Sequence, residues 1–237
     1  MVRREHQSLK IAIPALAFVM ALSFAEAFAA PPRTQGSAPE AGAGAGAVPP
    51  AGAPAAATEV NGFRSARFGM TEDEVRKAAA KDLSVKADAF KAEDHALERT
   101  RVLSVRVPDV LPKGGTAAVS YILGYTSKKL IQVNVLWSKA TDPAMTPELM
   151  VANANLLGSY FQEQGFKPDS VVVNAPASGG IVVFRGLDQQ GRMVAVSLLG
   201  TTQSKDGQQQ FSPAALQLSY VSDPVKPDVF RVQPGQF

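Results

Sequence analysis

Cysteine is absent from this chain of 237 residues, and tryptophan and histidine are scarce, with one and two copies. The absence of cysteine excludes disulfide bonds, thiolate nucleophiles, cysteine-ligated zinc and the acylated cysteine of a lipoprotein. His6 lies in a segment that we expect to be removed, which leaves His95 as the single histidine. A histidine-rich metal site is therefore excluded, and any Ser-His-Asp triad would need His95.

Two further signatures of enzymes are missing. No Gly-x-Ser-x-Gly nucleophile elbow occurs. The glycine-rich segments 114–116 and 178–180 have neither the P-loop spacing nor a following lysine, and both precede expected strands. We interpret both segments as turns, and we expect neither catalysis nor a cofactor.

A short acidic cluster is the remaining candidate for chemistry. Glu93, Asp94, His95 and Glu98 include the side-chain types of a metal site or an acid–base pair. They lie in a charged connector between the first expected helix and the first expected strand, where a solvated run is the ordinary explanation. A carboxylate pair that only the fold brings together has no local motif, so a hydrolase of this kind stays open as an alternative.

Neither sign of charge is in large excess. The chain has 24 Lys and Arg against 21 Asp and Glu, and without the first 29 residues 21 basic minus 19 acidic residues leaves +2. Nucleic-acid-binding proteins carry a strong basic bias or a basic stripe. We therefore expect no nucleic-acid partner.

The first 29 residues have the order of parts of a secretory signal peptide. Arg3, Arg4 and Lys10 form a positive start, and an uncharged, mostly apolar run follows from Ile11 to Ala25. This run has 15 residues, whereas a bilayer span needs about 20. Ala27 and Ala29 form an Ala-x-Ala pattern that predicts cleavage before Ala30, and Ala25-Glu26-Ala27 offers a second site two residues earlier. We expect a periplasmic or secreted protein with no transmembrane span in its mature chain.

Residues 30–59 are rich in alanine, proline and glycine and have no periodic apolar face. Such a composition cannot bury enough apolar surface to offset its ordering entropy, and its prolines favour extended conformations. We expect a disordered linker there, a folded domain over 60–222 and a loose tail over 223–237. The domain is long enough to be stabilised by core burial without disulfides.

Two helices are predicted within the domain. Thr71 and Glu74 have the spacing of a capping box, which predicts a helix of about three turns that starts at Thr71. Thr146 and Pro147 begin the second helix, and Gly165 lies at its end. The second helix has a wide apolar stripe, which predicts deep burial. Two rows form this stripe: Leu149, Ala152, Leu156 and Tyr160, and Met150, Ala154, Leu157 and Phe161.

Period-two alternation predicts strands between and after the helices. We expect an α+β fold in which the helices pack on one face of an antiparallel sheet of about six to eight strands. Trp137, at the end of a strand, is expected in the core. The expected strands cover 99–107, 116–125 and 130–137 in a first group, and 170–174, 181–187, 192–199 and 214–221 in a second.

A helix followed by strands occurs twice along the domain, which predicts two repeated units, 60–140 and 141–222. Segments 124–135 and 186–198 align as similar hairpins whose polar turns differ by one residue. The alignment favours an internal duplication.

The entry to the first helix resembles that of the SmpA/OmlA (BamE) envelope proteins. The family motif is Gly-Met-Thr-x-x-x-Val, and this chain reads Phe68-Gly69-Met70-Thr71-Glu72-Asp73-Glu74-Val75. The small helix-then-hairpin fold of that family also resembles each half of the tandem beta-lactamase inhibitor proteins. The resemblance implies a non-enzymatic envelope module that works by contact with other proteins. This chain departs from the family in having no lipoprotein cysteine and a long insert at 84–116.

Arg99 and Arg101 are the candidate binding residues. With period two they share one face of the expected strand, and Arg106 lies on the other face. Their guanidinium groups can bind carboxylates or phosphates of a partner; the alternative is a charged solvent face that discourages edge-to-edge aggregation.

We expect an exported, soluble, non-catalytic interaction or accessory module of the bacterial cell envelope, with an envelope protein as its partner. A periplasmic carrier, in which the second helix and the sheet enclose a small molecule or lipid, is the alternative.

Overall fold

The computed structural model describes residues 57–205, 208–232 and 235. The expected signal peptide and nearly all of the expected linker lie outside the described residues. The described residues form two α-helices, α1 (Glu72–Leu83) and α2 (Pro147–Gln162), and one large antiparallel sheet. Both helices pack on the same face of this sheet, in one hydrophobic core, which confirms the predicted α+β class.

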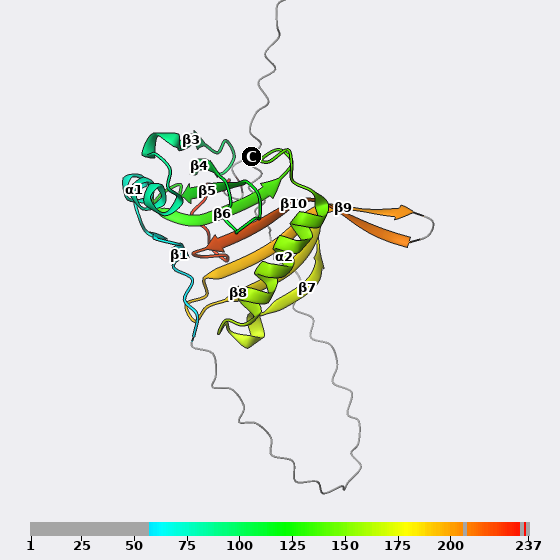
Figure 1. Cartoon of the computed structure of the whole chain (residues 1–237). Coiled ribbons are helices and arrows are strands. Elements are labelled where there is room, and N and C mark those ends of the chain that lie inside the picture. The colour runs from blue at the N-terminus through cyan, green and yellow to red at the C-terminus, as the bar shows by residue number, and fades with distance from the viewer. Residues whose placement is uncertain (1–56, 206–207, 233–234, 236–237) are drawn as a thin grey trace, which may run out of the picture. The chain divides into compact units, whose positions relative to one another are not determined.

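The large sheet has eight strands in the order β3-β4-β5-β6-β10-β9-β8-β7, and neighbouring strands are antiparallel (Figure 1). A separate two-stranded sheet precedes α1 and consists of β1 (Gly62–Phe63) and β2 (Ala66–Arg67). The eight strands are β3 (Lys91–Asp94), β4 (Arg101–Val107), β5 (Ala117–Leu123), β6 (Leu130–Ser138), β7 (Val172–Ala177), β8 (Gly180–Leu187), β9 (Met193–Lys205) and β10 (Gln208–Val221).

The same order of elements occurs twice in the described chain. A short 3-10 helix (Ala87–Ala89) and β3 to β6 follow α1, and a second one (Pro168–Ser170) and β7 to β10 follow α2. The two groups of strands meet where β6 pairs with β10. The sequence alignment of 124–135 with 186–198 compares the β5–β6 hairpin with the β8–β9 hairpin. These hairpins are not equivalent, because β5–β6 are the third and fourth strands of the first group and β8–β9 are the second and third strands of the second group. An internal duplication stays a prediction, and the order of elements favours an alignment of β5–β6 with β9–β10.

Helix α1 begins where the capping-box spacing predicts. The Glu74 N–H donates to the Thr71 hydroxyl, and the Thr71 N–H donates to the Glu74 carboxylate at 2.8 Å. The hydrogen bond from the Thr71 backbone has the largest effect on the Glu74 carboxyl. Together with the bond from the Thr71 side chain, it holds the pKa of Glu74 below its ordinary value. Val75, Ala79 and Leu83 face the core at helical spacing.

Helix α2 is less deeply buried than its wide apolar stripe predicts. Leu156 and Tyr160 each expose 56% of their surface. A helix that packs on a sheet buries only one stripe of its surface. The row that contains Leu156 and Tyr160 therefore lies beside the contact with the sheet. The buried row is Met150, Ala154, Leu157 and Phe161.

The core between the helices and the sheet contains Trp137, which is fully buried, as predicted. Near the C-terminal end of α2 the core is aromatic. The rings of Phe161 and Phe184 stack with centroids 5.7 Å apart, and Phe166 lies 5.3 Å from Phe184. Such pairs stabilise a core beyond the area that they bury.

The start of the C-terminal tail is docked on the domain, whereas the sequence analysis predicts a loose tail over 223–237. The Tyr125 N–H donates to the Asp228 carbonyl at 2.8 Å, and the Asp228 carboxylate accepts hydrogen bonds from the N–H groups of Thr126 and Ser127. The Phe230 ring lies edge-on to Tyr125 with centroids 5.5 Å apart. The tail through Phe230 therefore belongs to the folded domain.

Candidate interaction site

The two candidate binding arginines are each engaged by other residues of the chain. Strand β4 begins at Arg101, and Arg99 precedes it with a φ of 53°. The Arg99 guanidinium lies 3.7 Å from the centroid of the Phe230 ring. The Arg101 side chain lies 3.4 Å from the Glu72 carboxylate and 3.3 Å from that of Asp94. Arg99 is thus outside the strand, and the two do not form the shared strand face that the sequence predicts.

An open groove of about 350 Å³ lies beside Arg101. Its lining includes the carboxylates of Glu72 and Asp94, which are the two that pair with Arg101. A hydrolytic pair needs an acid and a base that can each reach the substrate. Here one guanidinium is shared by both carboxylates, which favours a structural ion-pair network.

The acidic cluster around His95 is spread over a strand and a turn. Glu93 and Asp94 are exposed in β3, and His95 and Glu98 lie in the turn before β4. The Glu98 N–H donates to His95 Nδ1 at 3.1 Å, and burial raises the pKa of the Glu98 carboxyl. Among the described residues, no group of three or more His, Asp or Glu side chains is placed to hold a metal ion.

A second hollow, of about 140 Å³, lies between α2 and the segment before β1. Tyr160, Phe161, Phe166 and Tyr220 form its aromatic lining. Pockets that enclose small-molecule ligands usually measure about 300–1,000 Å³. This hollow is too small to enclose a ligand of that class.

The sheet face opposite the helices has an unusual composition at its centre. On the four central strands, β5, β6, β10 and β9, every side chain of this face within the domain body is uncharged. Polar side chains of this face hydrogen-bond to each other, because Gln217 Nε2 donates to Ser219 Oγ at 2.8 Å and Gln132 Nε2 donates to Asn134 Oδ1 at 2.9 Å. Asn134, Gln217 and Ser219 are buried. The residues of this face are Ala118, Ser120, Ile122, Gln132, Asn134, Leu136, Ser138, Met193, Ala195, Ser197, Leu199, Ala215, Gln217, Ser219 and Val221.

Strands β9 and β10 continue beyond the rest of the sheet as a projecting arm (Figure 1). Strand β8 pairs with β9 only as far as Leu199, and β6 pairs with β10 only as far as Ala215. From there outward, segments 200–205 and 208–213 pair with each other, and no third strand of the described chain joins them. At about 3.4 Å per residue, this arm is about 20 Å long.

The base of the arm is fixed by a bulge and an aromatic ring. The pairing register shifts between Pro213 and Ala215, as in a β-bulge, and Pro213 lies opposite Gly200. A Cβ atom on Gly200 would lie 3.0 Å from the Phe211 ring, and Phe211 also packs against the core. The same Cβ would collide with the Ser212 carbonyl oxygen, so the close approach of the β10 backbone requires glycine here. The Phe211 ring attaches the base of the arm to the core.

The uncharged face of the sheet continues onto the arm. Side chains alternate between the two faces of a strand, so Thr201 and Gln203 lie on the same face as Ser197. Their partners across the hairpin are Ser212 and Gln210. All four arm residues are exposed and uncharged. We call the exposed surface formed by Thr201, Gln203, Gln210 and Ser212 the uncharged β9–β10 face.

The sequence analysis missed the arm because it ended one strand at Leu199 and began the next at Ala214. The intervening residues are polar and lack the apolar alternation by which strands were identified. One local signal was present, since Asp206-Gly207 is a favoured two-residue hairpin sequence, here between runs of Thr, Gln and Ser.

Comparisons of this chain with family models, with curated proteins and with solved structures found no match. In the described part of the chain, neither helix has the length and apolar character that crossing a membrane requires.

Proposed function

We propose that this protein is a non-catalytic interaction module of the bacterial cell envelope, and that it binds another envelope protein through the uncharged β9–β10 face. The signal peptide over 1–29 directs export, so the module works in the periplasm or in the medium.

The arm is the observation that carries this proposal. A two-stranded ribbon without a third strand is only marginally stable in water, and most of the arm's side chains add nothing to the core. Its face carries Thr201, Gln203, Gln210 and Ser212, all exposed and uncharged. The centres of protein interfaces are depleted of charged residues. A projecting face of this composition, continuous with the sheet, suits contact with a protein partner.

The resemblance of the first helix entry to the SmpA/OmlA envelope proteins supports the same function. That resemblance rests on residues 68–75 and implies a module that works by contact with other proteins. Thr71 of this motif is the N-cap residue of α1.

The carrier and the hydrolase have weaker support. The hollow beside α2 measures about 140 Å³, less than a small-molecule ligand requires. The carboxylates of Glu72 and Asp94 share the Arg101 guanidinium. The hollow and the carboxylate pair are therefore weaker candidates for the functional site than the arm.

Affinity purification from a chemically cross-linked envelope tests the proposed function. The tagged protein is expected to recover one partner in a stoichiometric amount. A variant with Gln210→Glu and Ser212→Glu places two charges on the uncharged face and should lose that partner. Ser159→Glu, at an exposed position on α2, is the matched control and should keep it. Recovery of a bound small molecule without a partner, or equal recovery by both variants, would contradict the proposal.

Export is tested separately by N-terminal sequencing of the protein purified from the cell envelope or the medium. The expected mature start is Ala30, or Phe28 if the earlier Ala-x-Ala site is used. A protein that starts at Met1 would contradict cleavage.

A further inference from the structure

The outer side of α2 carries a row of uncharged, mostly apolar side chains. Leu156 and Tyr160 are each more than half exposed. No charged residue occurs in α2 between Glu148 and the end of the helix at Gln162. In Figure 1 no helix or strand of the described chain covers this side of α2. We call the row formed at helical spacing by Leu149, Ala152, Leu156 and Tyr160 the outer α2 row.

The described chain enters the domain at the end of this row. Ala57 forms a parallel bridge with Gly165, which follows α2. The Thr58 N–H donates to the Gly165 carbonyl at 3.1 Å, and the Gly165 N–H donates to the Thr58 hydroxyl at 3.0 Å. Thr58 and Tyr160 also line the same small hollow. Ala57 is therefore attached beside the last turn of α2, on the side of Tyr160.

The parallel pairing sets the direction in which the preceding residues continue. Paired parallel segments run the same way, so the chain before Ala57 continues in the direction of the residues before Gly165, which form the last turn of α2. Segment 51–56 reads Ala-Gly-Ala-Pro-Ala-Ala and has no charge. A polyproline II helix rises about 3.1 Å per residue and has about three residues per turn. In this conformation Pro54 lies about 9 Å before Ala57, on the same face as Ala51.

We propose that segment 51–56 docks on the outer α2 row of the same chain as a short polyproline II helix, with Pro54 against the Tyr160 ring. The segment then passes over Leu156. It brings Ala51 near Ala152, because α2 rises about 1.5 Å per residue and Ala51 lies about 19 Å before Ala57.

The chemistry of the segment matches that of the row. Polyproline II segments bind to surfaces lined by aromatic side chains, and Tyr160 provides such a surface beside the point of attachment. An uncharged segment on an uncharged row removes no ionised group from water. Because the segment is attached at Ala57, docking is intramolecular, and the effective concentration is about millimolar. A weak contact is therefore enough to hold it, and the predicted disordered linker is limited to residues 30–50.

This inference goes beyond the proposed function and does not depend on it. The segment docks on α2, whereas the proposed partner binds the uncharged β9–β10 face. A cross-link between α2 and segment 51–56 lies within one chain and is distinct from a cross-link to a partner.

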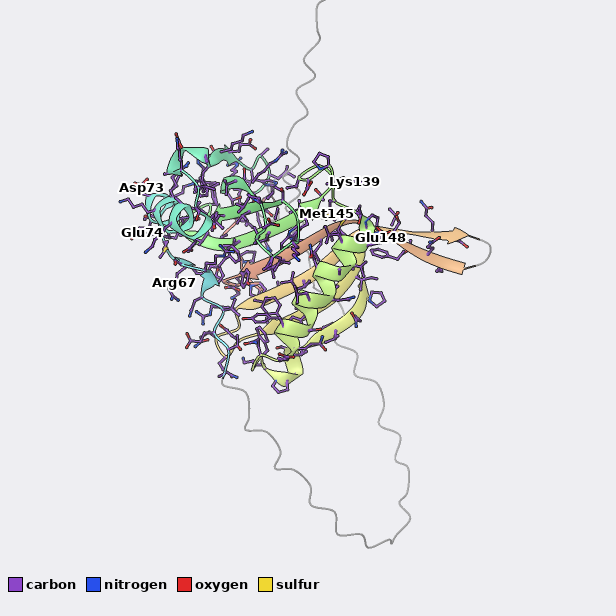
Figure 2. The ribbon with its side chains drawn as sticks, in the orientation of Figure 1. Arg67, Asp73, Glu74, Lys139, Met145 and Glu148 are labelled. Atoms are coloured by element: carbon purple, nitrogen blue, oxygen red, sulfur yellow. The ribbon has the colours of Figure 1, made fainter. Side chains whose placement is uncertain are left out.

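Paramagnetic relaxation in NMR spectra of the mature chain tests the docking. The chain has no cysteine, so Val48→Cys provides a single site for a nitroxide label. Docking places residue 48 about 28 Å before Ala57, beside the first turn of α2, which contains Glu148 (Figure 2). The Leu149 amide should then lose most of its signal intensity. A free segment keeps the label about 15–18 Å from Ala57 on average, and loss of intensity centred on Gly165 would overturn the proposal.

Matched variants of the labelled chain show whether the row holds the segment. Tyr160→Ala and Pro54→Gly should each restore most of the Leu149 intensity. Val151→Ala, on the opposite flank of α2, and Pro39→Gly, outside the segment, are the controls and should not restore it. An equal effect of all four changes would overturn the proposal.

A mixture of nitroxide-labelled chains and isotope-labelled chains without nitroxide tests whether the contact is intramolecular. The Leu149 amide of the isotope-labelled chains should keep its intensity. Loss of intensity in the mixture would show that the segment of a second copy occupies the row, and it would overturn the intramolecular contact. Partner recovery in the affinity purification should be the same for Tyr160→Ala and the wild type, so the two proposals fail separately.

Discussion

The backbone N–H of Val60 donates a hydrogen bond to the carboxylate of Asp188 at 2.9 Å, across 128 residues of sequence. Asp188 is fully buried at the turn between β8 and β9. The same carboxylate accepts hydrogen bonds from the Arg192 backbone and from the Arg192 guanidinium, at 2.9 and 2.6 Å. One side chain thus fixes the start of the folded domain to the turn between β8 and β9.

Replacement of Asp188 by Asn is expected to lower the free energy of unfolding by about 2–3 kcal/mol, because the amide cannot accept all of these hydrogen bonds and leaves buried donors unpaired. Urea denaturation measures the change. Asp88→Asn, at an exposed position, is the control and should lie within about 0.5 kcal/mol of the wild type. Equal stability of the two variants would show that Asp188 does not hold the entry segment.

The stability contributed by Asp188 should depend on pH. Burial raises the pKa of Asp188, but the hydrogen bonds from Val60 and Arg192 outweigh this effect and hold the pKa below its ordinary value. A group with a depressed pKa in the folded state stabilises the fold above its unfolded pKa of about 3.9 and loses that contribution as the pH falls through the folded pKa. The difference in unfolding free energy between wild type and Asp188→Asn should therefore be constant from about pH 5 to 7 and shrink below about pH 4. A difference that grows on acidification would contradict this assignment.

Two adjacent aromatic residues of α2 should respond very differently to truncation. Phe161 is buried against Phe184, whereas Tyr160 is more than half exposed. Phe161→Ala is expected to cost about 3–5 kcal/mol through lost contacts and the cavity that remains. Tyr160→Ala should cost less than about 1 kcal/mol. Denaturation midpoints of the two variants measure the contrast, and similar losses would mean that the helix is oriented differently on the sheet.

Docking of the tail is testable at single-residue resolution. Burial raises the pKa of Asp228, but hydrogen bonds from Ser127 and Thr126 outweigh burial and hold the pKa below its ordinary value. Asp228→Ala should speed hydrogen exchange at the Thr126 and Ser127 amides, which donate to this carboxylate. Exchange at Leu218, in the middle of the sheet, should not change. Unchanged protection of the two turn amides would show that the tail is not held there.

The parts of the fold that the sequence predicts are those that depend on neighbours in the chain. The capping box of Thr71 and Glu74 acts over three residues, and the polar turn at Asp188 acts over four, so both positions were predicted. The docking of Phe230 against Tyr125 and Arg99 joins segments about 100 residues apart or more, and no local pattern reports it.

The candidate site illustrates the same limit. Arg99 and Arg101 lie two residues apart, which predicts a shared face only if the strand already includes both. The turn before β4 instead places Arg99 in a left-handed conformation over Phe230. The arm, in turn, lacks the apolar alternation by which strands are recognised, because it has no core to face. Its polar residues were therefore predicted to form a loop between two strands, although the sequence Asp206-Gly207 is typical of a hairpin turn.

Site-specific photo-cross-linking in the native envelope tests the central claim most directly. A photoreactive amino acid at Thr201 or Ser212, on the uncharged β9–β10 face, should form a cross-link to one envelope protein that is distinct from this chain. The same amino acid at Ser159, on the exposed side of α2, should form none. Cross-links from Ser159 in place of Thr201 and Ser212, or none from any of the three positions, would contradict the assignment of the arm as the surface that binds a partner.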